Sequence, residues 1–507
     1  MLSVINAPIL RTPQGRRRKR ISISPKKPTF KPRISDPCPQ SPTVARPEPH
    51  LEALERLELE FPHSYFDDEK KQFRMLSRDV SFKLLEVLRK RFPQVLNILP
   101  VAPFLVIECE GDVPDPSTTP FLIAGLIACF IIAGQGYPFG IDFIGEDGGA
   151  LGLTEADVPA SVWNDIKPFH IPQLATFEWI HKFIPHAEYV SSFPQQLVVE
   201  LAQMQNEEFQ NVLISLPDTI GCLNVGYVNG PILTKKFARQ KAPQPLQSEG
   251  EYDDSDYLDL DNGGTLRPGL LLECAGYLDD EGMRRGICAS NSGIKVCKDD
   301  KIRLTVAAHG WDAVQDKVVY HPTRHGHNIG NIVETIGEDI GLASLICPFT
   351  NEFPELQVKA KTLLHSSQLR YNQFAVIDSC FTGVQTLRVL GVRTGADSRL
   401  QGTDGQEPVP GPMQYGRYIK VCQGIYGVNA AVIPTQPQIR QGVCGTPLIV
   451  GGANKRKMTH VLGDGIVAGF MLWNDIEGRY NLDRQIYSFC QTTDPLIESG
   501  WSVCDEA

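Results

Sequence analysis

The sequence predicts an α+β protein whose 507 residues end in a large all-β part. Two patterns lead to this fold class. From residue 265 onward, short apolar runs alternate with Gly, Asn, Asp and Pro, which is typical of a barrel or a sandwich of short strands. Between residues 50 and 235, helical and strand patterns are mixed. Hydrophobic residues make up 42% of the chain, enough to fill real cores.

Residues 1–49 are predicted to form a disordered basic tail, because a stretch rich in Pro, Ser and Arg cannot bury a core. The cluster Arg16 to Arg20 is either a nuclear localisation signal or a solvated basic arm, and the sequence favours neither. The N-terminus lacks the charged start and apolar run of a signal peptide. We therefore expect a cytoplasmic or nuclear protein.

Residues 50–235 are predicted to form a mixed α/β domain. Leucines at helical spacing predict helices over 51–61 and 73–92, and 104–107 reads as a buried strand. The apolar run 121–133 follows a helix-start signal at 117–119. A membrane span needs about 20 residues, so a buried helix is the better interpretation of this run. The domain carries no catalytic motif, and a regulatory partner is a hypothesis by elimination.

Residues 236–264 are predicted to be an acidic, flexible linker. The segment from Glu249 to Asp261 holds seven acidic residues and no basic one, a composition that resists packing. A solvated spacer is favoured over a segment that covers a basic surface.

Residues 265–507 carry the predicted strands. About 240 residues is the size expected of two six-stranded barrels, and 395–413, rich in Gly and Pro, is expected to be a surface loop. The strands are expected around 270–272, 302–306, 374–377, 389–392, 418–421 and 430–433.

Charge and cysteine usage limit the function. The net charge is −10, but residues 1–35 hold ten basic and no acidic residues, so the remainder carries 39 bases against 59 acids. An acidic body argues against nucleic-acid binding by the folded part. Thirteen cysteines at scattered positions, an odd number, argue against a disulfide framework.

Three separated motifs supply the residue types of a nucleophilic active site. His309 follows the apolar run 304–308, Asp339 precedes Ile340, and Cys444 lies between Val443 and Gly445 in a glycine-rich turn. A thiol attacks a carbonyl carbon once an imidazole has taken its proton, and a carboxylate on the far ring nitrogen orients the imidazole. Backbone N–H groups of Gly442 and Cys444 are expected to form an oxyanion hole.

In these motifs, in this order, the chain resembles the chymotrypsin-like double-barrel peptidases. Val-Ala-Ala-His at 306–309 is similar to the Thr-Ala-Ala-His of that family, and Gly-Val-Cys-Gly at 442–445 is similar to the cysteine version of viral 3C-type proteases. The resemblance covers roughly residues 266–507 and implies two six-stranded barrels, the first with His309 and Asp339 and the second with Cys444. It implies an intracellular endopeptidase that acts on protein or peptide substrates and needs no cofactor. Gln438 and the strand Ala468, Gly469 and Phe470 are then expected to border an uncharged substrate pocket.

The chain departs from that family at several positions. Cys444 replaces the usual serine, Val443 stands where secreted members carry the aspartate of zymogen activation, and Thr446 replaces a second glycine. Gly310 stands in place of a disulfide cysteine, which fits a reduced protein. Two alternatives stay open: a degenerate barrel that acts only as a binding scaffold, and a protease that cuts itself near the acidic linker.

Two other groups are weaker candidates. The histidines at 321, 325 and 327 form a tract of the kind that binds metals, but no carboxylate or thiol lies at a ligand spacing within it. Cys288 precedes His309 as in papain-type enzymes, yet its context carries no matching motif. We therefore expect no metal site and a structural role for Cys288.

Overall fold

The computed structural model divides the chain into two units, Met1–Glu48 and Pro49–Ala507, and all described residues belong to the second. The predicted basic tail, the predicted linker and the predicted strand at 430–433 lie outside the described residues. The structure describes residues 58–59, 61–114, 119–134, 145–230, 265–274, 277–278, 284–285, 289–312, 316–322, 326–337, 339–371, 373–396, 415–423, 443–450, 463–472 and 486–504.

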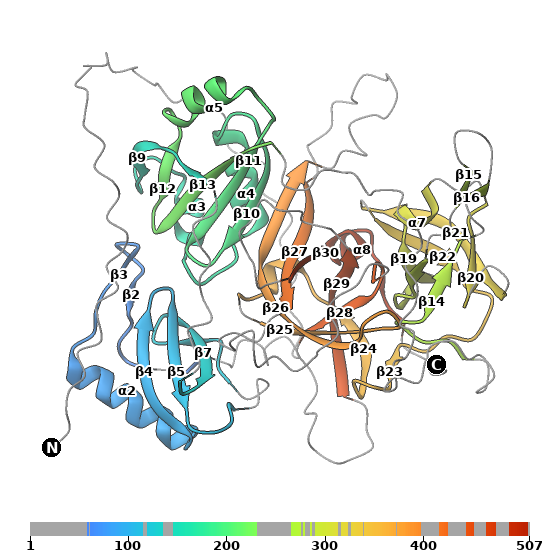
Figure 1. Ribbon diagram of the computed structural model, residues 1–507, viewed down its shortest axis with the longest axis horizontal. Helices are drawn as coiled ribbons and strands as arrows, with labels where there is room; N and C mark the ends of the chain where they lie inside the picture. The colour runs from blue at the N-terminus through green and yellow to red at the C-terminus, as the bar shows by residue number, and fades with distance from the viewer. Residues whose placement is uncertain are drawn as a thin grey trace. The chain divides into compact units, whose positions relative to one another are not determined.

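The N-terminal module, residues 58–134, packs one helix on a five-stranded sheet (Figure 1). Helix α2 (Arg78–Arg91) begins where the Ser77 hydroxyl accepts a hydrogen bond from the Val80 N–H, and it buries Leu84 and Leu88. The strand order is β1 (Glu58–Leu59), β6 (Leu122–Ile123), β7 (Leu126–Ile132), β5 (Phe104–Cys109) and β4 (Val95–Val101).

Two helix predictions for this module differ from the structure in the residues that it describes. The helix predicted over 73–92 starts only at Arg78, because β2 (Phe66–Asp67) and β3 (Gln72–Phe73) form a hairpin before it. At the end of the stretch predicted as helix 51–61, β1 pairs in parallel with β6. Residues 58–59 are therefore not helical as the leucine spacing predicts, because their pairing with β6 fixes an extended backbone.

The predicted buried helix over 121–133 is wrong: this run forms β6 and β7. Ala124 and Gly125 turn the chain with positive φ values of 50° and 75°, and β7 then pairs with β5 on one side and β6 on the other. A strand covered on both faces is apolar throughout, so periodicity cannot separate it from a buried helix. No helix in the described residues is long and apolar enough to cross a membrane.

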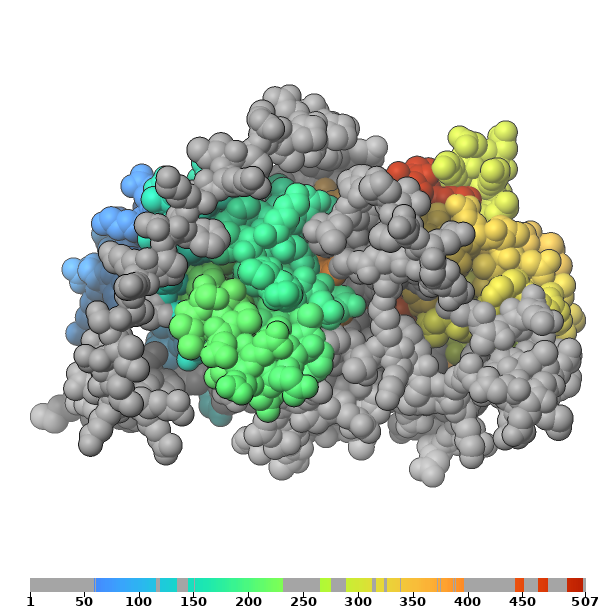
Figure 2. All heavy atoms as spheres, turned by 90° about the horizontal axis from the view of Figure 1, so that it is seen from above, coloured from blue at the N-terminus to red at the C-terminus, as the bar shows by residue number. Residues whose placement is uncertain are grey.

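The middle module, residues 145–230, places three helices against a second group of strands, and its green residues gather on the face seen in Figure 2. Ile180 and Phe177 of α4 are fully buried in its core with Val199 of β11. The elements are β8 (Glu146–Asp147), β9 (Gly149–Leu153), α3 (Ala160–Asp165), α4 (Leu174–Phe183), β10 (Ala187–Phe193), β11 (Gln196–Leu201), α5 (Asn206–Leu213), β12 (Pro217–Ile220) and β13 (Leu223–Asn229).

The first curled sheet of the C-terminal part lies within residues 265–344 and takes in a short strand from the end of the chain. Its order is β17-β14-β20-β21-β22-β19-β18-β31. β17 and β18 are consecutive segments, and Gly293 and Ile294 between them bond to Thr305 of β19, so the chain connects β17, at one end of the sheet, to β18 near the other end. The strands are β14 (Leu271–Glu273), β17 (Ala289–Asn291), β18 (Lys295–Lys298), β19 (Lys301–Ala307), β20 (Val318–His321), β21 (His327–Ile336), β22 (Ile340–Ser344) and β31 (Ser502–Val503), with β15 (Tyr277–Leu278) and β16 (Arg284–Arg285) as a separate hairpin.

Six later strands form a closed ring of backbone pairings, β25-β26-β27-β30-β29-β28 and back to β25 (Figure 1). The chain is therefore mostly β with few helices, and its C-terminal sheets curl as the strand pattern predicts. The elements are β23 (Glu352–Phe353), β24 (Val358–Leu363), η1 (Ser366–Gln368), β25 (Phe374–Ser379), β26 (Gly383–Ala396), β27 (Tyr415–Gln423), β28 (Pro447–Val450), β29 (Gly463–Leu472), β30 (Ile486–Thr492) and α8 (Asp494–Glu498).

The ring continues into the middle module, because β10 pairs with β26 in antiparallel register. Arg393 of β26 makes a bidentate ion pair with Glu200 of β11, at 2.9 and 2.7 Å, and both side chains are buried. The same guanidinium lies 3.5 Å from the ring centre of Tyr189. Hydrogen bonds, a buried charge pair and ring stacking thus connect these two parts of the chain.

Candidate active site

His309 and Asp339 come together because their strands are neighbours. β19 and β22 pair in antiparallel register, with Ala307 opposite Ile340, so the residues just beyond these partners meet at one edge. His309 opens α7 (His309–Asp312). Its Nδ1 lies 2.8 and 2.9 Å from the two carboxylate oxygens of Asp339, and its backbone N–H donates to Oδ1 at 2.7 Å. The carboxylate therefore fixes both the ring and the main chain of His309.

The second ring nitrogen of His309 is left for Cys444. The side chains of His309 and Cys444 share a hydrogen bond, and because Nδ1 is engaged by Asp339, Nε2 is the nitrogen available to the thiol. Burial lowers the pKa of His309, but the charges of Asp339 and Cys444 and the hydrogen bonds to both raise it, and the net effect lifts it well above its usual value. The imidazole is 24% exposed and Asp339 only 6%, so the pair is only partly screened by solvent.

Cys444 lies in a turn held against the first sheet. Its carbonyl oxygen accepts hydrogen bonds from the Asn291 N–H at 2.9 Å and the Ser290 hydroxyl at 2.8 Å, both from β17. Gly445 has φ +84°, and a Cβ there would lie 2.7 Å from the Asn291 carbonyl oxygen. Glycine is therefore required at 445 for close contact with the first sheet as well as for the turn.

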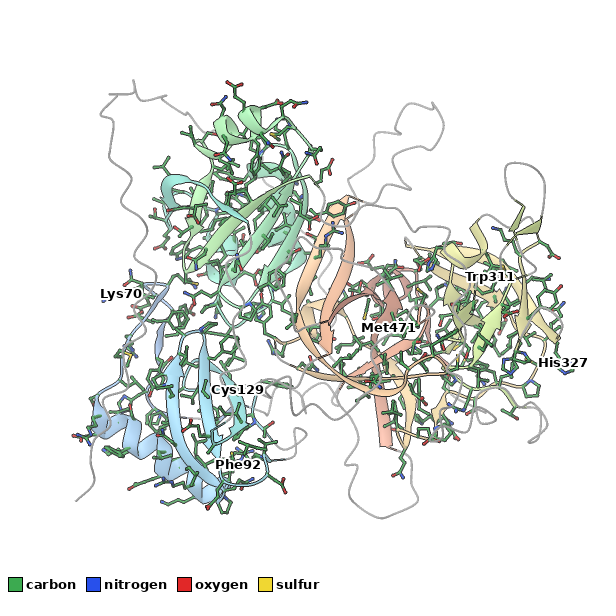
Figure 3. The ribbon with its side chains drawn as sticks, in the orientation of Figure 1. Lys70, Phe92, Cys129, Trp311, His327 and Met471 are labelled. Carbon is green, nitrogen blue, oxygen red and sulfur yellow. The ribbon has the colours of Figure 1, made fainter. Side chains whose placement is uncertain are left out.

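The predicted substrate strand lies in β29, with its side chains packed inward. Ala468 and Phe470 are 0% and 4% exposed and belong to two hydrophobic clusters. The residue of β29 that bonds to the turn carrying Cys444 is Met471, labelled within the ring in Figure 3. Its carbonyl oxygen accepts from the Gly445 N–H at 2.9 Å, and its N–H donates to the Thr446 carbonyl oxygen at 2.8 Å. Gly469 pairs with Leu448 and Thr492.

Gln491 is a site residue that the sequence motifs did not indicate. It lies in β30 of the ring and is 3% exposed, and its Oε1 accepts the backbone N–H of Asp339 at 2.7 Å. The Asp339 carbonyl oxygen in turn accepts from the Ala308 N–H at 2.8 Å. No local motif marks such a residue, because the strand that carries it pairs within the other sheet.

The remaining candidate residues either lie outside the described residues or lie elsewhere in the first sheet. Gly442, Gln438 and Cys288 lie outside the described residues. His321 and His327 face each other across β20 and β21, and His327 is labelled at the surface end of this sheet in Figure 3. Within the described residues, no three His, Cys, Asp or Glu side chains are grouped as metal ligands.

Comparison with known proteins adds little to this geometry. No protein-family model matches the sequence, and no curated protein matches it. Similar solved structures include a glutamic acid-specific serine protease, Nocardiopsis protease and an alpha-lytic protease homologue. Their identities are 13%, 12% and 12%, their TM-scores 0.27, 0.26 and 0.27, and they cover 47%, 48% and 47% of this chain and 100%, 100% and 98% of their own. Scores this low carry no argument, so the function must be argued from the site.

Proposed function

We propose that the chain is a cysteine endopeptidase of the chymotrypsin-like, double six-stranded barrel type, with Cys444, His309 and Asp339 as its catalytic triad. The observation that carries the proposal is the pair of hydrogen bonds made by His309, one to Asp339 and one to Cys444. Such a chain of nucleophile, base and orienting carboxylate defines the triad mechanism.

Each residue has a defined role in the proposed reaction. His309 takes the proton of the Cys444 thiol, and the sulfur attacks the carbonyl carbon of a protein or peptide substrate. The resulting imidazolium, stabilised by Asp339, gives its proton to the leaving amine, and water then releases the acyl group from the sulfur. The raised pKa of His309 supports this sequence, because it favours the charged imidazole that the leaving group needs. We assign Gly442 and Cys444 N–H groups to the oxyanion.

The setting and specificity follow from the same proposal. The cysteines whose side chains the structure describes form no disulfide, which supports a reducing compartment, cytoplasmic or nuclear. If Gln438 lines the pocket for the residue before the scissile bond, that pocket is uncharged, and substrates with Arg at this position should not dominate.

The test is digestion of a proteome-derived peptide library, read by mass spectrometry, with wild type, Cys444→Ala and His309→Ala. A matched control is Cys347→Ala, which removes another free, half-buried thiol. Cleavage by wild type and Cys347→Ala alone supports the endopeptidase. Cleavage that survives in Cys444→Ala would refute it.

A binding scaffold built on the same fold is the second candidate, and the burial of Cys444, 6% exposed, favours it. The two are separated by a peptidyl electrophile that labels an activated thiol. Labelling of Cys444 that is lost in His309→Ala supports the enzyme. Labelling of Cys444 no faster than that of Cys347, together with no cleavage, supports the scaffold.

A further inference from the structure

A cavity of about 410 Å³ lies where the N-terminal module, the segment before α4 and the start of β25 come together. Its walls include Phe121, Phe169 and Tyr371, and its polar groups include Asp165, Lys167 and Arg370. The size falls in the range of small-molecule sites, about 300–1,000 Å³. None of these residues belongs to the candidate active site.

The acid in the cavity is fully engaged by the protein. Asp165 accepts from the His170 ring at 3.2 Å through Oδ1, and from the Gln173 N–H and the Thr176 hydroxyl at 2.8 and 2.6 Å through Oδ2. Burial raises the pKa of Asp165, but the hydrogen bonds lower it by more than burial raises it, so the net shift is downward. Asp165 therefore remains a carboxylate with both oxygens bound to protein donors.

The two basic side chains of the cavity, Lys167 and Arg370, differ in their ion pairing. Lys167 pairs with Asp68 at 3.1 Å. Among the described residues, the half-buried Arg370 guanidinium has no ion pair, and its residue's hydrogen bonds are made by the main chain to Gln373. An arginine fork presents parallel N–H donors that suit a carboxylate or a phosphate. Arg370 is thus the group in this cavity that is suited to bind an anionic ligand.

The other walls suit a flat apolar body. Tyr371 is 3% exposed, Phe169 and Leu122 pack against the same hydrophobic cluster, and Phe169 also makes an edge contact with Phe66 at 5.4 Å. Aromatic walls around one charged group are the usual composition of a small-molecule site. Tyr371 and Ile127 of the cavity belong to the same hydrophobic cluster as Val443, which precedes Cys444.

From this arrangement we propose that the cavity is a binding site for a small organic anion, a carboxylate or phosphate carried on a flat apolar ring, with Arg370 as its anion anchor. The apolar body lies against Phe169, Leu122 and Tyr371. This site is independent of the proposed peptidase activity, since binding requires neither Cys444 nor His309.

The experiment is titration calorimetry and thermal unfolding of the full chain with phenyl phosphate and benzoate as probes. Inorganic phosphate and phenol each carry one half of the proposed ligand and serve as matched probes. Arg370→Gln removes the charge, and Asn164→Trp fills the cavity from an exposed lining position. Arg78→Gln, on the exposed face of α2, is the arginine control.

We expect phenyl phosphate or benzoate to bind and to raise the Tm. Arg370→Gln should weaken the affinity tenfold or more and reduce the rise in Tm, and Asn164→Trp should abolish both. Loss of one charge-assisted pair accounts for a factor of this order. Arg78→Gln should behave as wild type, and both half-ligands should bind more weakly than the intact probe. Equal binding by Arg370→Gln, no binding of any probe at millimolar concentration, or inorganic phosphate binding as tightly as phenyl phosphate would each overturn the proposal.

Discussion

Gln491, in β30 of the ring, accepts the backbone N–H of Asp339, and its removal tests whether it positions the proposed catalytic carboxylate. In Gln491→Leu, the Asp339 N–H loses the Oε1 acceptor that now lies 2.7 Å away. A buried donor left without a partner costs about 1–3 kcal/mol, and a less firmly held Asp339 orients His309 poorly. We expect a lower unfolding free energy and at least a tenfold fall in kcat of the proposed peptidase.

The matched control is Gln385→Leu, at a buried glutamine whose side chain donates to the Thr382 carbonyl oxygen. Both variants should lose stability, measured by urea unfolding, but only Gln491→Leu should lose activity beyond that. Equal activity in the two variants would assign Gln491 a structural role only.

His309 makes the stability of the protein depend on pH in a defined direction. Its pKa in the folded protein is raised by Asp339 and Cys444 in spite of burial, which lowers it. The stabilising contribution is therefore complete below the unfolded histidine pKa, about 6.5, and is lost as the pH rises through the higher folded value. Asp339→Asn removes the largest raising cause and should reduce this loss.

The measurement is the unfolding free energy in urea between about pH 6 and pH 9, with the exposed His63→Gln as a control. Wild type and His63→Gln should lose stability more steeply across this interval than Asp339→Asn. Parallel curves for all three would show that the Asp339 carboxylate does not hold the proton on His309.

The proximity of His309, Asp339 and Cys444 could be predicted because a triad needs particular residue types in a particular order. Hydrogen bonds link His309 to the other two side chains, and the catalytic roles of the three residues stay predictions. Gln491 and Met471 could not be predicted, because their roles depend on strand register between segments far apart in the chain. Arg370 was missed for the same reason: only the fold brings it to an aromatic cavity.

The turn that carries Cys444 depends on Gly445, and Gly445→Ala separates the two reasons for a glycine. The substitution meets the positive φ of +84° and places a Cβ 2.7 Å from the Asn291 carbonyl oxygen. Gly111→Ala is the matched control, because Gly111 has φ +72° and no atom within 4 Å of its Cβ position. The control should cost about 1 kcal/mol of backbone strain, and Gly445→Ala clearly more, measured as the change in unfolding free energy.

The excess cost of Gly445→Ala should be accompanied by loss of the proposed peptidase activity, since the turn can relieve the clash only by moving Cys444 away from β17. Costs that are equal in the two variants would mean that the contact with Asn291 is not constrained.

Element types were predicted well where the period was clear and poorly where it was not. The strands at β19, β25, β26 and β27 lie where the apolar runs indicate. The run 121–133 forms strands, because its apolar character reflects burial on both faces and not a helical period. Pairing of β10 with β26 was beyond any local pattern, because it joins segments about 200 residues apart.

Segments that are far apart in the sequence share one sheet and one hydrophobic core. The middle module and the ring share one continuous sheet through β10 and β26, and Phe104, Ile127 and Ile171 from before the predicted linker lie in the same core as Val443 and Leu448. We infer that residues 58–230 act as a structural part of the proposed enzyme, whatever partner they also bind.

The Arg393–Glu200 pair measures this connection. Breaking one member of a buried ion pair leaves an unpaired charge and costs about 3–5 kcal/mol, whereas replacing both with apolar residues of similar size is often close to neutral. We therefore expect Arg393→Met and Glu200→Leu each to lower the unfolding free energy strongly, and the double variant to recover much of the loss. Single-variant costs that simply add in the double variant would show that the two charges do not interact.

The final prediction concerns truncation. A chain that starts at residue 49 keeps every described contact, because residues 1–48 form a separate unit, and it should unfold with the Tm of the full chain. A chain that starts at residue 265 loses β10, one of the strands paired with β26, leaves Arg393 without Glu200, and uncovers the cluster shared with Ile127 and Ile171. An unpaired strand edge beside an apolar face favours aggregation, so this chain should be insoluble or unfold at a much lower temperature. A soluble 265–507 fragment with the full-chain Tm and full peptidase activity would show that the C-terminal sheets are self-sufficient and that the shared strand contributes nothing to them.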